Sequence, residues 1–362
     1  MVKEIVIHLG DCKTGTTSIQ SVLASGAWKT PTGGVGGGII YPARFNHMNL
    51  AKTLTVEEVK PFQEKHFAKL RKAFDESDAA IGVISAEHFE FVDPALVKAA
   101  IEQHLPEYAD HIRLVAYVRP HADRLVSTFA ERTKKGLFYK SLSAMHEKLV
   151  DKRTLFYTPR FEKWRALFGE RFTLRPFVRD RLRHADVVQD FFHYLFESDE
   201  FEITRATESN ESLSVEDVAM LRAIHRHFRQ NPNIHQMQQQ SFGWYMSDLL
   251  AATPGRGDTR PRLHKALAQQ VVDTYHDDAC ALDEAFFEAS PMVDALQAAP
   301  DKAVATAQSF KAVDHYDAAQ IRHFKIWAQM LMRLILADPK HFSWAMRPPE
   351  QRGLHPSKRK MH

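Results

Sequence analysis

A short loop near the amino terminus carries side chains suited to holding a tetrahedral anion. It runs Gly10-Asp11-Cys12-Lys13-Thr14-Gly15-Thr16-Thr17, after an apolar run and before an amphipathic segment. Gly10 and Gly15 allow the backbone to curl, and Lys13 supplies a mobile ammonium group. Hydroxyl donors come from three threonines: Thr14, Thr16 and Thr17. Free N–H groups of the following helix would converge on the same point, so the loop predicts an anion site rather than an ordinary strand-to-helix turn.

The loop is related to a Walker A motif but departs from it. Gly10 and Gly15 keep the glycine spacing of that motif, and Thr17 fits its final Ser/Thr position. Thr16 stands where the motif has lysine, and no clear acidic partner for Mg²⁺ follows a strand. A P-loop-like nucleotide kinase or NTPase is therefore a disfavoured alternative. A non-catalytic nucleotide-binding module is a second alternative.

The elements that must position this loop alternate between strand and helix. Apolar, β-branched runs predict strands at 4–9, 81–84, 112–118 and 171–177, the last at an edge because it contains Pro176. Helical spacing follows at 16–24, 94–104 and 120–134. This rhythm predicts an α/β fold with a central, mostly parallel sheet covered by helices on both faces.

The last third of the chain lacks strand patterns. Ser214 and Asp217 predict a capped helix over 214–229, and helices continue to about residue 336. We expect an α/β core at 1–230, a helical extension at 231–346 packed on that core, and a flexible basic tail at 347–362. The glycine-rich run at 33–38 follows a predicted helix, which favours a flexible loop over a dinucleotide-binding turn.

Composition excludes several classes of protein. The 362 residues are 44% hydrophobic and 26% charged, which excludes wholesale disorder. A net charge of +3 argues against a dedicated duplex-DNA binder. The two cysteines cannot form a disulfide framework, no signal peptide is evident, and the apolar stretch 326–336 is shorter than the roughly 20 residues of a membrane span. We expect a soluble, cytoplasmic protein.

Two motifs resemble the sulfotransferases that use 3′-phosphoadenosine 5′-phosphosulfate (PAPS). Lys13-Thr14-Gly15-Thr16-Thr17, after the first strand, resembles their 5′-phosphosulfate loop. Arg119 ends a predicted strand and Ser127 follows eight residues later in a helix, like the residues that bind the 3′-phosphate in that family. Further segments resemble bacterial members, so that the resemblance covers about residues 4–230: Ile39–Pro42 with His47 and Leu50, Ile84–Phe89, and Asn210–Ser214.

The resemblance implies a P-loop-like three-layer fold and transfer of a sulfuryl group from PAPS to a hydroxyl or amine acceptor. Transfer by in-line displacement would leave adenosine 3′,5′-bisphosphate as the product. No metal is required, and no ligand set with convincing spacing is present. Lys13 is expected to stabilise the charge that develops on the leaving group. The expected PAPS-binding residues are Lys13, Thr14, Gly15, Thr16, Thr17, Arg119, Ser127 and Asn210.

A general base must accept the proton of the acceptor. Glu87 is the first choice because it follows a strand that should end at the same sheet edge as the loop. A helix-start acid or an ion-pair partner is its structural alternative. His47 is second and His88 third. Asp11 is a departure from the family pattern, because an acid beside an anion site must point away from it.

The acceptor is not readable from the sequence. Small molecules, glycans and lipids are the classes considered, with no nucleic acid and no membrane span. Basic residues in 175–183 suit an anionic glycan or lipid, but a solvated surface explains them equally well. The C-terminal helices either wall the acceptor pocket or form an oligomer contact.

Overall fold

The computed structural model describes residues 1–31, 34–204, 213–253, 259–347 and 352. The chain divides into two compact units, each assembled from separate stretches. The first unit contains 1–120, 156–208 and 276–295, and the second contains 121–155, 209–275 and 296–362. Helix α11, Lys265–Phe286, and helix α12, Pro291–Gln297, each contribute residues to both.

The first unit is built on a five-stranded sheet with strand order β4-β5-β1-β6-β7. Every neighbouring pair is parallel, which confirms the predicted α/β class. Strand β7 lies at the edge, as its proline predicts. The strands are β1 Glu4–His8, β4 Ile39–Ile40, β5 Ile81–Ser85, β6 Ile112–Val118 and β7 Phe172–Pro176.

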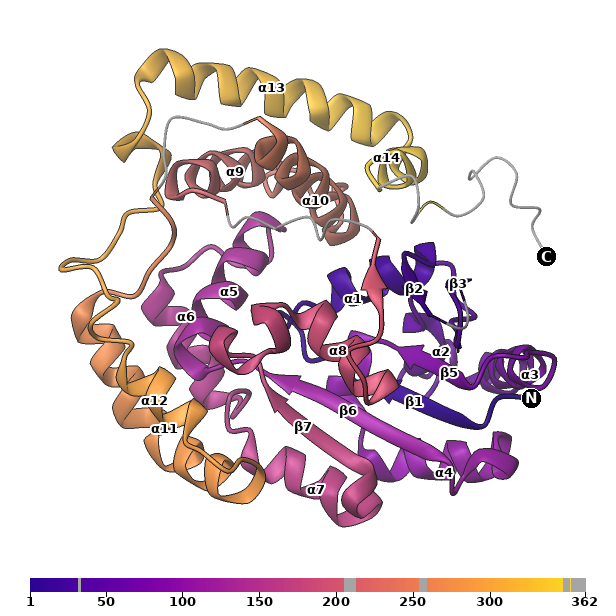
Figure 1. The fold of residues 1–362 in the computed structure, drawn as a ribbon. Helices are drawn as coiled ribbons and strands as arrows, with labels where there is room; N and C mark the ends of the chain where they lie inside the picture. The colour runs from indigo at the N-terminus through magenta and orange to yellow at the C-terminus, as the bar shows by residue number, and fades with distance from the viewer. Residues whose placement is uncertain (32–33, 205–212, 254–258, 348–351, 353–362) are drawn as a thin grey trace. The chain divides into compact units, whose positions relative to one another are not determined.

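Helices cover both faces of this sheet (Figure 1). On one face, Val6 and Val115 pack in a core with Val22 of α1 and Phe191 of α8. On the other face, Ile84 shares a small internal space with side chains of α3 and α4, and α7 packs against α4 and β7. The covering helices are α1 Thr16–Ser25, α3 Gln63–Asp75, α4 Pro94–His104, α7 Thr158–Phe168 and α8 Val187–Phe196; the short α2 is Met48–Lys52.

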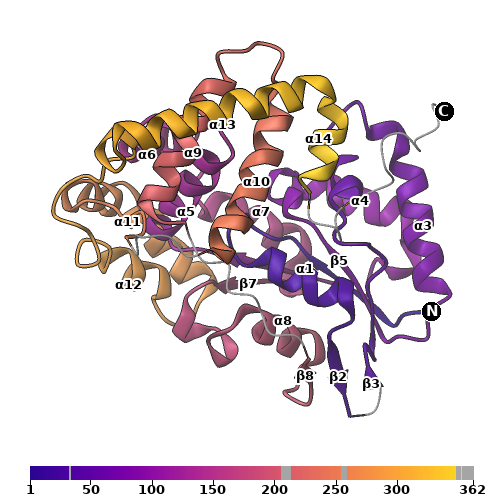
Figure 2. The same cartoon turned by 90° about the horizontal axis from the view of Figure 1, so that it is seen from above.

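A second, small sheet corrects part of the expectation of a loop at 33–38, because Gly34 and Val35 form a strand, whereas Gly33 lies outside the described residues. Strands β2 (Trp28–Thr30), β3 (Gly34–Val35) and β8 (Glu202–Ile203) pair in the order β3-β2-β8, as Figure 2 shows. Gly34, Gly36 and Gly38 all have positive φ angles. Gly34 belongs to strand β3 and pairs with Thr30, whereas Gly36 and Gly38 belong to the turn that follows this strand, where glycine readily adopts a positive φ.

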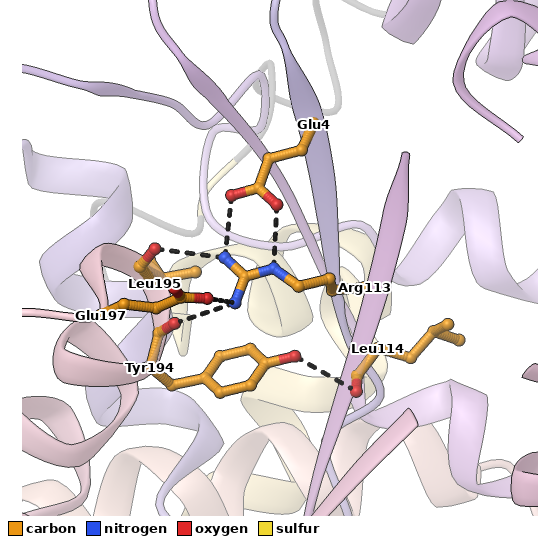
Figure 3. Close-up of polar contacts among 6 residues, drawn as sticks. All are labelled: Glu4, Arg113, Leu114, Tyr194, Leu195 and Glu197. Carbon is orange, nitrogen blue, oxygen red and sulfur yellow. Dashed lines mark hydrogen bonds and ion pairs between the residues drawn. The ribbon is translucent and has the colours of Figure 1, made fainter. Parts of the chain in front are cut away.

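An ion-pair cluster fixes the carboxyl end of α8 to the sheet (Figure 3). The Arg113 guanidinium on β6 donates to both carboxylate oxygens of Glu4 on β1, at 2.8 Å each. It also donates to Glu197 at 2.9 Å and to the carbonyls of Tyr194 and Leu195. These carboxylates raise the pKa of Arg113 against the opposing effect of burial. Helix α8 is thereby held at one end, while its first residue, Val187, lies against Gly15 in the loop between β1 and α1.

The second unit is helical. Its helices are α5 His121–Lys134, α6 Leu142–Asp151, α9 Val215–Phe228, α10 Gln236–Ala252, α13 Ala318–Ala337 and α14 Pro339–Ala345. Ser214 and Asp217 form the predicted capping box at the start of α9. Helix α13 runs alongside α9 (Figures 1 and 2). No helix in the described part of the chain combines the length and apolar character needed to cross a membrane.

The compact units are discontinuous in sequence, and the expected division at residue 230 remains a prediction. Helices α5, α6 and α9 lie in the second unit, whereas 276–295 lies in the first. The reason is that contacts group segments distant in sequence, such as Tyr157 with Asp278. Most of the expected tail, 347–362, lies outside the described residues.

Candidate anion-binding site

The loop between β1 and α1 adopts a tightly curled backbone. Gly10, Lys13 and Gly15 have φ angles of 60°, 71° and 76°. For Lys13 this left-handed conformation is uncommon, so the surrounding structure must impose it. Gly15 occupies the N-cap position of α1, and no side chain caps the helix there. The N–H of Ser18 donates to the carbonyl of Gly15 at 3.0 Å, and the N–H groups of Thr16 and Thr17 at the start of the helix have no capping side chain.

Both glycines are required by close approach as well as by φ. A Cβ on Gly10 would lie 3.1 Å from Cα of Glu87. A Cβ on Gly15 would lie 2.6 Å from Cγ1 of Val187, at the start of α8, and 3.3 Å from the Phe177 ring. The loop is thus packed between the segment after β5 and the segment after β7, at the carboxyl ends of the strands, where ligands bind in open α/β sheets.

Asp11 points away from the site and into an ion pair. Its two carboxylate oxygens each accept a hydrogen bond from the Arg160 guanidinium of α7, at 2.6 Å. The Asp11 side chain is only 3% exposed. Its backbone carbonyl accepts hydrogen bonds from the hydroxyls of Thr14 (2.7 Å) and Thr16 (3.3 Å). Arg160 therefore neutralises the charge of the Asp11 carboxylate. The hydrogen bonds from the two threonine hydroxyls stabilise the curled conformation of the loop.

Helix α7, which carries Arg160, is held by a residue far along the chain. Asp278 on α11 accepts hydrogen bonds from the backbone N–H groups of Tyr157 (2.8 Å) and Thr158 (3.1 Å) at the start of α7. The Tyr157 hydroxyl then donates to the carbonyl of Arg119 at 3.0 Å. Arg160 and Asp278 carried no motif signal in the sequence, because their partners are more than a hundred residues away.

Arg119 lies against the loop. Its Nη1 donates to the carbonyl of Lys13 at 3.0 Å, and its guanidinium lies 5.6 Å from the centre of the Phe177 ring. The side chain therefore adds positive charge beside the loop and supports the strained conformation of Lys13. Ser127, its predicted partner, lies on α5 in the second unit.

Glu90 is a further acid that sequence reasoning missed. It belongs to the turn that starts at Glu87, residues Glu87–Phe91, and its carboxylate accepts the backbone N–H of Cys12 at 2.9 Å. The loop is thus connected to the end of β5 through both backbone packing and a hydrogen bond. In the sequence, the only signal for Glu90 was its position three residues after Glu87.

A buried polar network surrounds the end of β5. The backbone N–H of Ser85 donates to Nδ1 of His47 at 3.1 Å, and the Ser85 hydroxyl contacts Nδ1 of His8 (2.9 Å) and Nε2 of Gln20 (3.0 Å). Burial lowers the pKa of His47 to about 4 and that of His8 to about 3. Both imidazoles are therefore neutral at pH 7.

The candidate bases differ in their surroundings. Because Nδ1 of His47 accepts a hydrogen bond, its proton resides on Nε2, which presents a donor rather than an acceptor. Nε2 of His88 is engaged with the Thr55 hydroxyl at 2.7 Å, and burial is the main cause lowering the pKa of His88. Glu87 is partly buried, and its backbone lies against Gly10.

Several of the predicted site residues lie in the loop or against it. Those at or against the loop are Lys13, Thr14, Gly15, Thr16, Thr17, Glu87 and Arg119. His47 is linked to the same strand end through Ser85. Ser127 belongs to the other unit, and Asn210 lies outside the described residues. Within the described residues, no group of three or more His, Cys, Asp or Glu side chains is arranged to hold a metal ion.

Comparisons with known proteins return one distant structural likeness. No family model matches the chain, and no curated protein matches it. A crystal structure of a sulfotransferase from Alicyclobacillus acidocaldarius is similar with a TM-score of 0.42 and 12% sequence identity. The match covers 81% of this chain and 99% of that one.

Proposed function

We propose that the chain is a sulfotransferase that moves the sulfuryl group of PAPS to a hydroxyl or amine acceptor. The observation that carries the proposal is the curled Gly10–Gly15 loop, with an uncapped helix behind it and Arg119 bound to its backbone. In the same proposal the protein is a cytoplasmic enzyme of bacterial type; its two cysteines form no disulfide, which suits a reducing compartment.

The residues present fit a phosphosulfate group. An αL glycine at the N-cap supplies no side-chain cap, so an oxyanion can accept hydrogen bonds from the N–H groups of Thr16 and Thr17 at the start of α1. Neutralisation of Asp11 by Arg160 removes the one charge in the loop that would repel the anion. PAPS, when bound, supplies an activated sulfuryl group and a bisphosphate leaving group.

The roles of the chain's own groups follow from their positions. The Lys13 ammonium and the amino end of α1 stabilise negative charge on the leaving bisphosphate. Thr14 and Thr16 preserve the loop's curvature through the carbonyl of Asp11, while the exposed Thr17 hydroxyl is available to the anion. Arg119 neutralises phosphate charge and supports Lys13.

Glu87 is our proposed general base. A carboxylate can accept a proton at neutral pH, whereas neutral His47 carries its proton on Nε2 and is a weak base with a pKa of about 4. In this proposal His47 positions the end of β5 by accepting the backbone N–H of Ser85. His47 as the base remains the alternative that the second experiment below tests.

Thermal-shift titration tests the proposed donor. Adenosine 3′,5′-bisphosphate is expected to raise the melting temperature of the protein more than ATP does at equal concentration. Lys13→Ala should weaken the bisphosphate effect at least about tenfold, since it removes a charge-assisted contact. Lys163→Ala changes an exposed lysine on α7 and is the control, which should leave the response to the bisphosphate unchanged. Stabilisation by ATP but not by the bisphosphate would overturn the proposal.

Transfer of labelled sulfate from PAPS to a panel of hydroxyl and amine acceptors tests the base. Glu87→Gln should lower kcat by about 10²–10⁴-fold, the usual contribution of a general base, with bisphosphate binding retained. His47→Gln should have a much smaller effect on kcat, because glutamine can still accept the Ser85 N–H. If His47→Gln abolishes transfer and Glu87→Gln does not, the two assignments must be exchanged.

A further inference from the structure

A pocket of about 250 Å³ lies within the second unit. It is lined by α9, by Tyr139, by the segment Phe310–Val313 and by Ile321 at the start of α13. This volume is somewhat below the roughly 300–1,000 Å³ typical of sites for drug-sized ligands. The pocket is therefore of a size for a small organic molecule.

The pocket has a strongly cationic wall. Arg222, Arg226 and Arg229 line it from α9, and their spacing of four and three residues places them on one helix face. Lys311 lines it from the segment after Phe310. Like charges at such spacing destabilise a helix, so the arrangement costs free energy unless an anion offsets the repulsion.

Two of the three arginines contact Tyr139. Nη2 of Arg222 donates to the carbonyl of Tyr139, and the guanidinium of Arg229 lies 3.3 Å from the centre of the Tyr139 ring. In the described part of the chain, no carboxylate forms an ion pair with Arg222, Arg226 or Arg229. Burial lowers the pKa of Arg222, and the charges of the other two lower it further.

The helix dipole at the carboxyl end of α9 explains the positions of only some of these arginines. Arg226 lies in the last turn of the helix, and Arg229 follows it, where cations are stabilised by the helix dipole. Arg222 lies farther from that end and is partly buried. The acid nearest Lys311 in sequence, Asp314, is hydrogen-bonded to the Ser309 hydroxyl. Arg222 therefore retains a partly buried positive charge, and no carboxylate in the described part of the chain forms an ion pair with it.

The remaining walls are apolar. Ala219 and Ala223 contribute apolar surface from α9 beside the arginines, and Phe310, Val313 and Ile321 add apolar lining from the other segments. A ligand here would meet several positive charges on one wall and hydrocarbon surface on the others.

We propose that this pocket binds a small phosphate monoester with a compact apolar body. The phosphate dianion would contact Arg222, Arg226 and Lys311, since guanidinium forks suit phosphate oxygens. The apolar body would contact Phe310, Val313 and Ile321. Two negative charges match this wall better than one, so aryl phosphates should bind more tightly than the corresponding sulfates or carboxylates. The site belongs to the second unit and does not depend on the PAPS proposal.

Calorimetric titration of full-length protein with phenyl phosphate tests the proposal. All titrations use the Lys13→Ala background, so that binding at the loop does not contribute. Phenyl phosphate is expected to bind more tightly than phenyl sulfate, benzoate or inorganic phosphate. Arg226→Gln changes an exposed residue, and should weaken binding about tenfold or more. Ala223→Phe should block the pocket without altering its charge.

Arg333→Gln is the matched control, an exposed arginine on α13 that does not line the pocket. It should bind phenyl phosphate with unchanged affinity. Arg222→Lys keeps the charge but loses the fork, and should weaken binding several-fold. Absence of phenyl phosphate binding, or equal losses in Arg226→Gln and Arg333→Gln, would overturn the proposal. Tighter binding of phenyl sulfate or benzoate would overturn the assignment to a phosphate monoester.

Discussion

At the scale of single residues, the candidate site depends on the position and charge of the Asp11 carboxylate. Asp11 lies inside a loop suited to anions, and its carboxylate would repel them if it faced the site. The bidentate pair with Arg160 turns it into the protein, where it also orders the loop through its carbonyl. The sequence showed an acid beside a predicted anion site, and the structure pairs this acid with Arg160 of α7.

Arg160→Met should destabilise the protein by leaving the Asp11 carboxylate buried without a partner. Breaking fully buried pairs costs about 3–5 kcal/mol; here about 2–3 kcal/mol is expected because Arg160 is 23% exposed. Urea unfolding measures the change. The double variant Asp11→Asn with Arg160→Met should recover part of it, and Lys163→Met on the same helix is the control. A loss equal to that of the control would contradict a stabilising pair.

At the scale of elements, the strand–loop–helix unit is defined by its glycines. Gly15 combines a left-handed φ with close packing on Val187 of α8. Gly26, at the other end of α1, has φ 64°, but a Cβ added there would meet no packed neighbour within 4 Å. The two glycines that flank α1 therefore form a matched pair for substitution. A side chain at Gly15 would be strained and would also clash, whereas a side chain at Gly26 would only be strained.

Gly15→Ala should destabilise the protein more than Gly26→Ala. Both substitutions impose about 1–2 kcal/mol of backbone strain, but only Gly15→Ala forces its Cβ to 2.6 Å from Val187. Urea unfolding compares their stabilities, and thermal shift compares their response to adenosine 3′,5′-bisphosphate. Loss of that response is expected for Gly15→Ala alone. Equal effects of both substitutions would show that packing at Gly15 is unimportant.

At the scale of the whole molecule, three buried histidines make stability depend on pH. Burial lowers the pKa of His8 to about 3 and those of His47 and His225 to about 4. In the unfolded chain each has a pKa of about 6.5, so below that pH the unfolded state binds more protons. The unfolding free energy is therefore unaffected by these histidines above pH 6.5, and it decreases as the pH falls from 6.5 toward 4.

His47→Gln should flatten this acid dependence. Each such histidine contributes a slope of up to about 1.4 kcal/mol per pH unit between pH 6.5 and 4, and the substitution removes one. Glutamine can accept the Ser85 N–H, so stability at pH 7.5 should change little. Unfolding free energies across this range measure the slope, with the exposed His323→Gln as control. An unchanged slope would mean that His47 is protonated in the folded protein.

The sequence by itself determined the parallel α/β class, the four longer strands of the main sheet, the capped helix α9 and the loop with its candidate anion-binding groups. These features follow from local patterns: periodicity, glycine positions and capping residues. The short strands β4, β2, β3 and β8 were missed, because strands of two or three residues depend on their pairing partners rather than on a pattern of their own.

Only the tertiary structure decided which residues support the loop. Arg160 lies 149 positions from Asp11, and Asp278 lies 121 positions from Tyr157. Local periodicity contains no information about such pairs, since any exposed arginine or aspartate has the same sequence signature. The discontinuous units and the arginine-lined pocket have the same origin. Their residues meet because helices distant along the chain bury apolar faces together, and that packing determines which charges become neighbours.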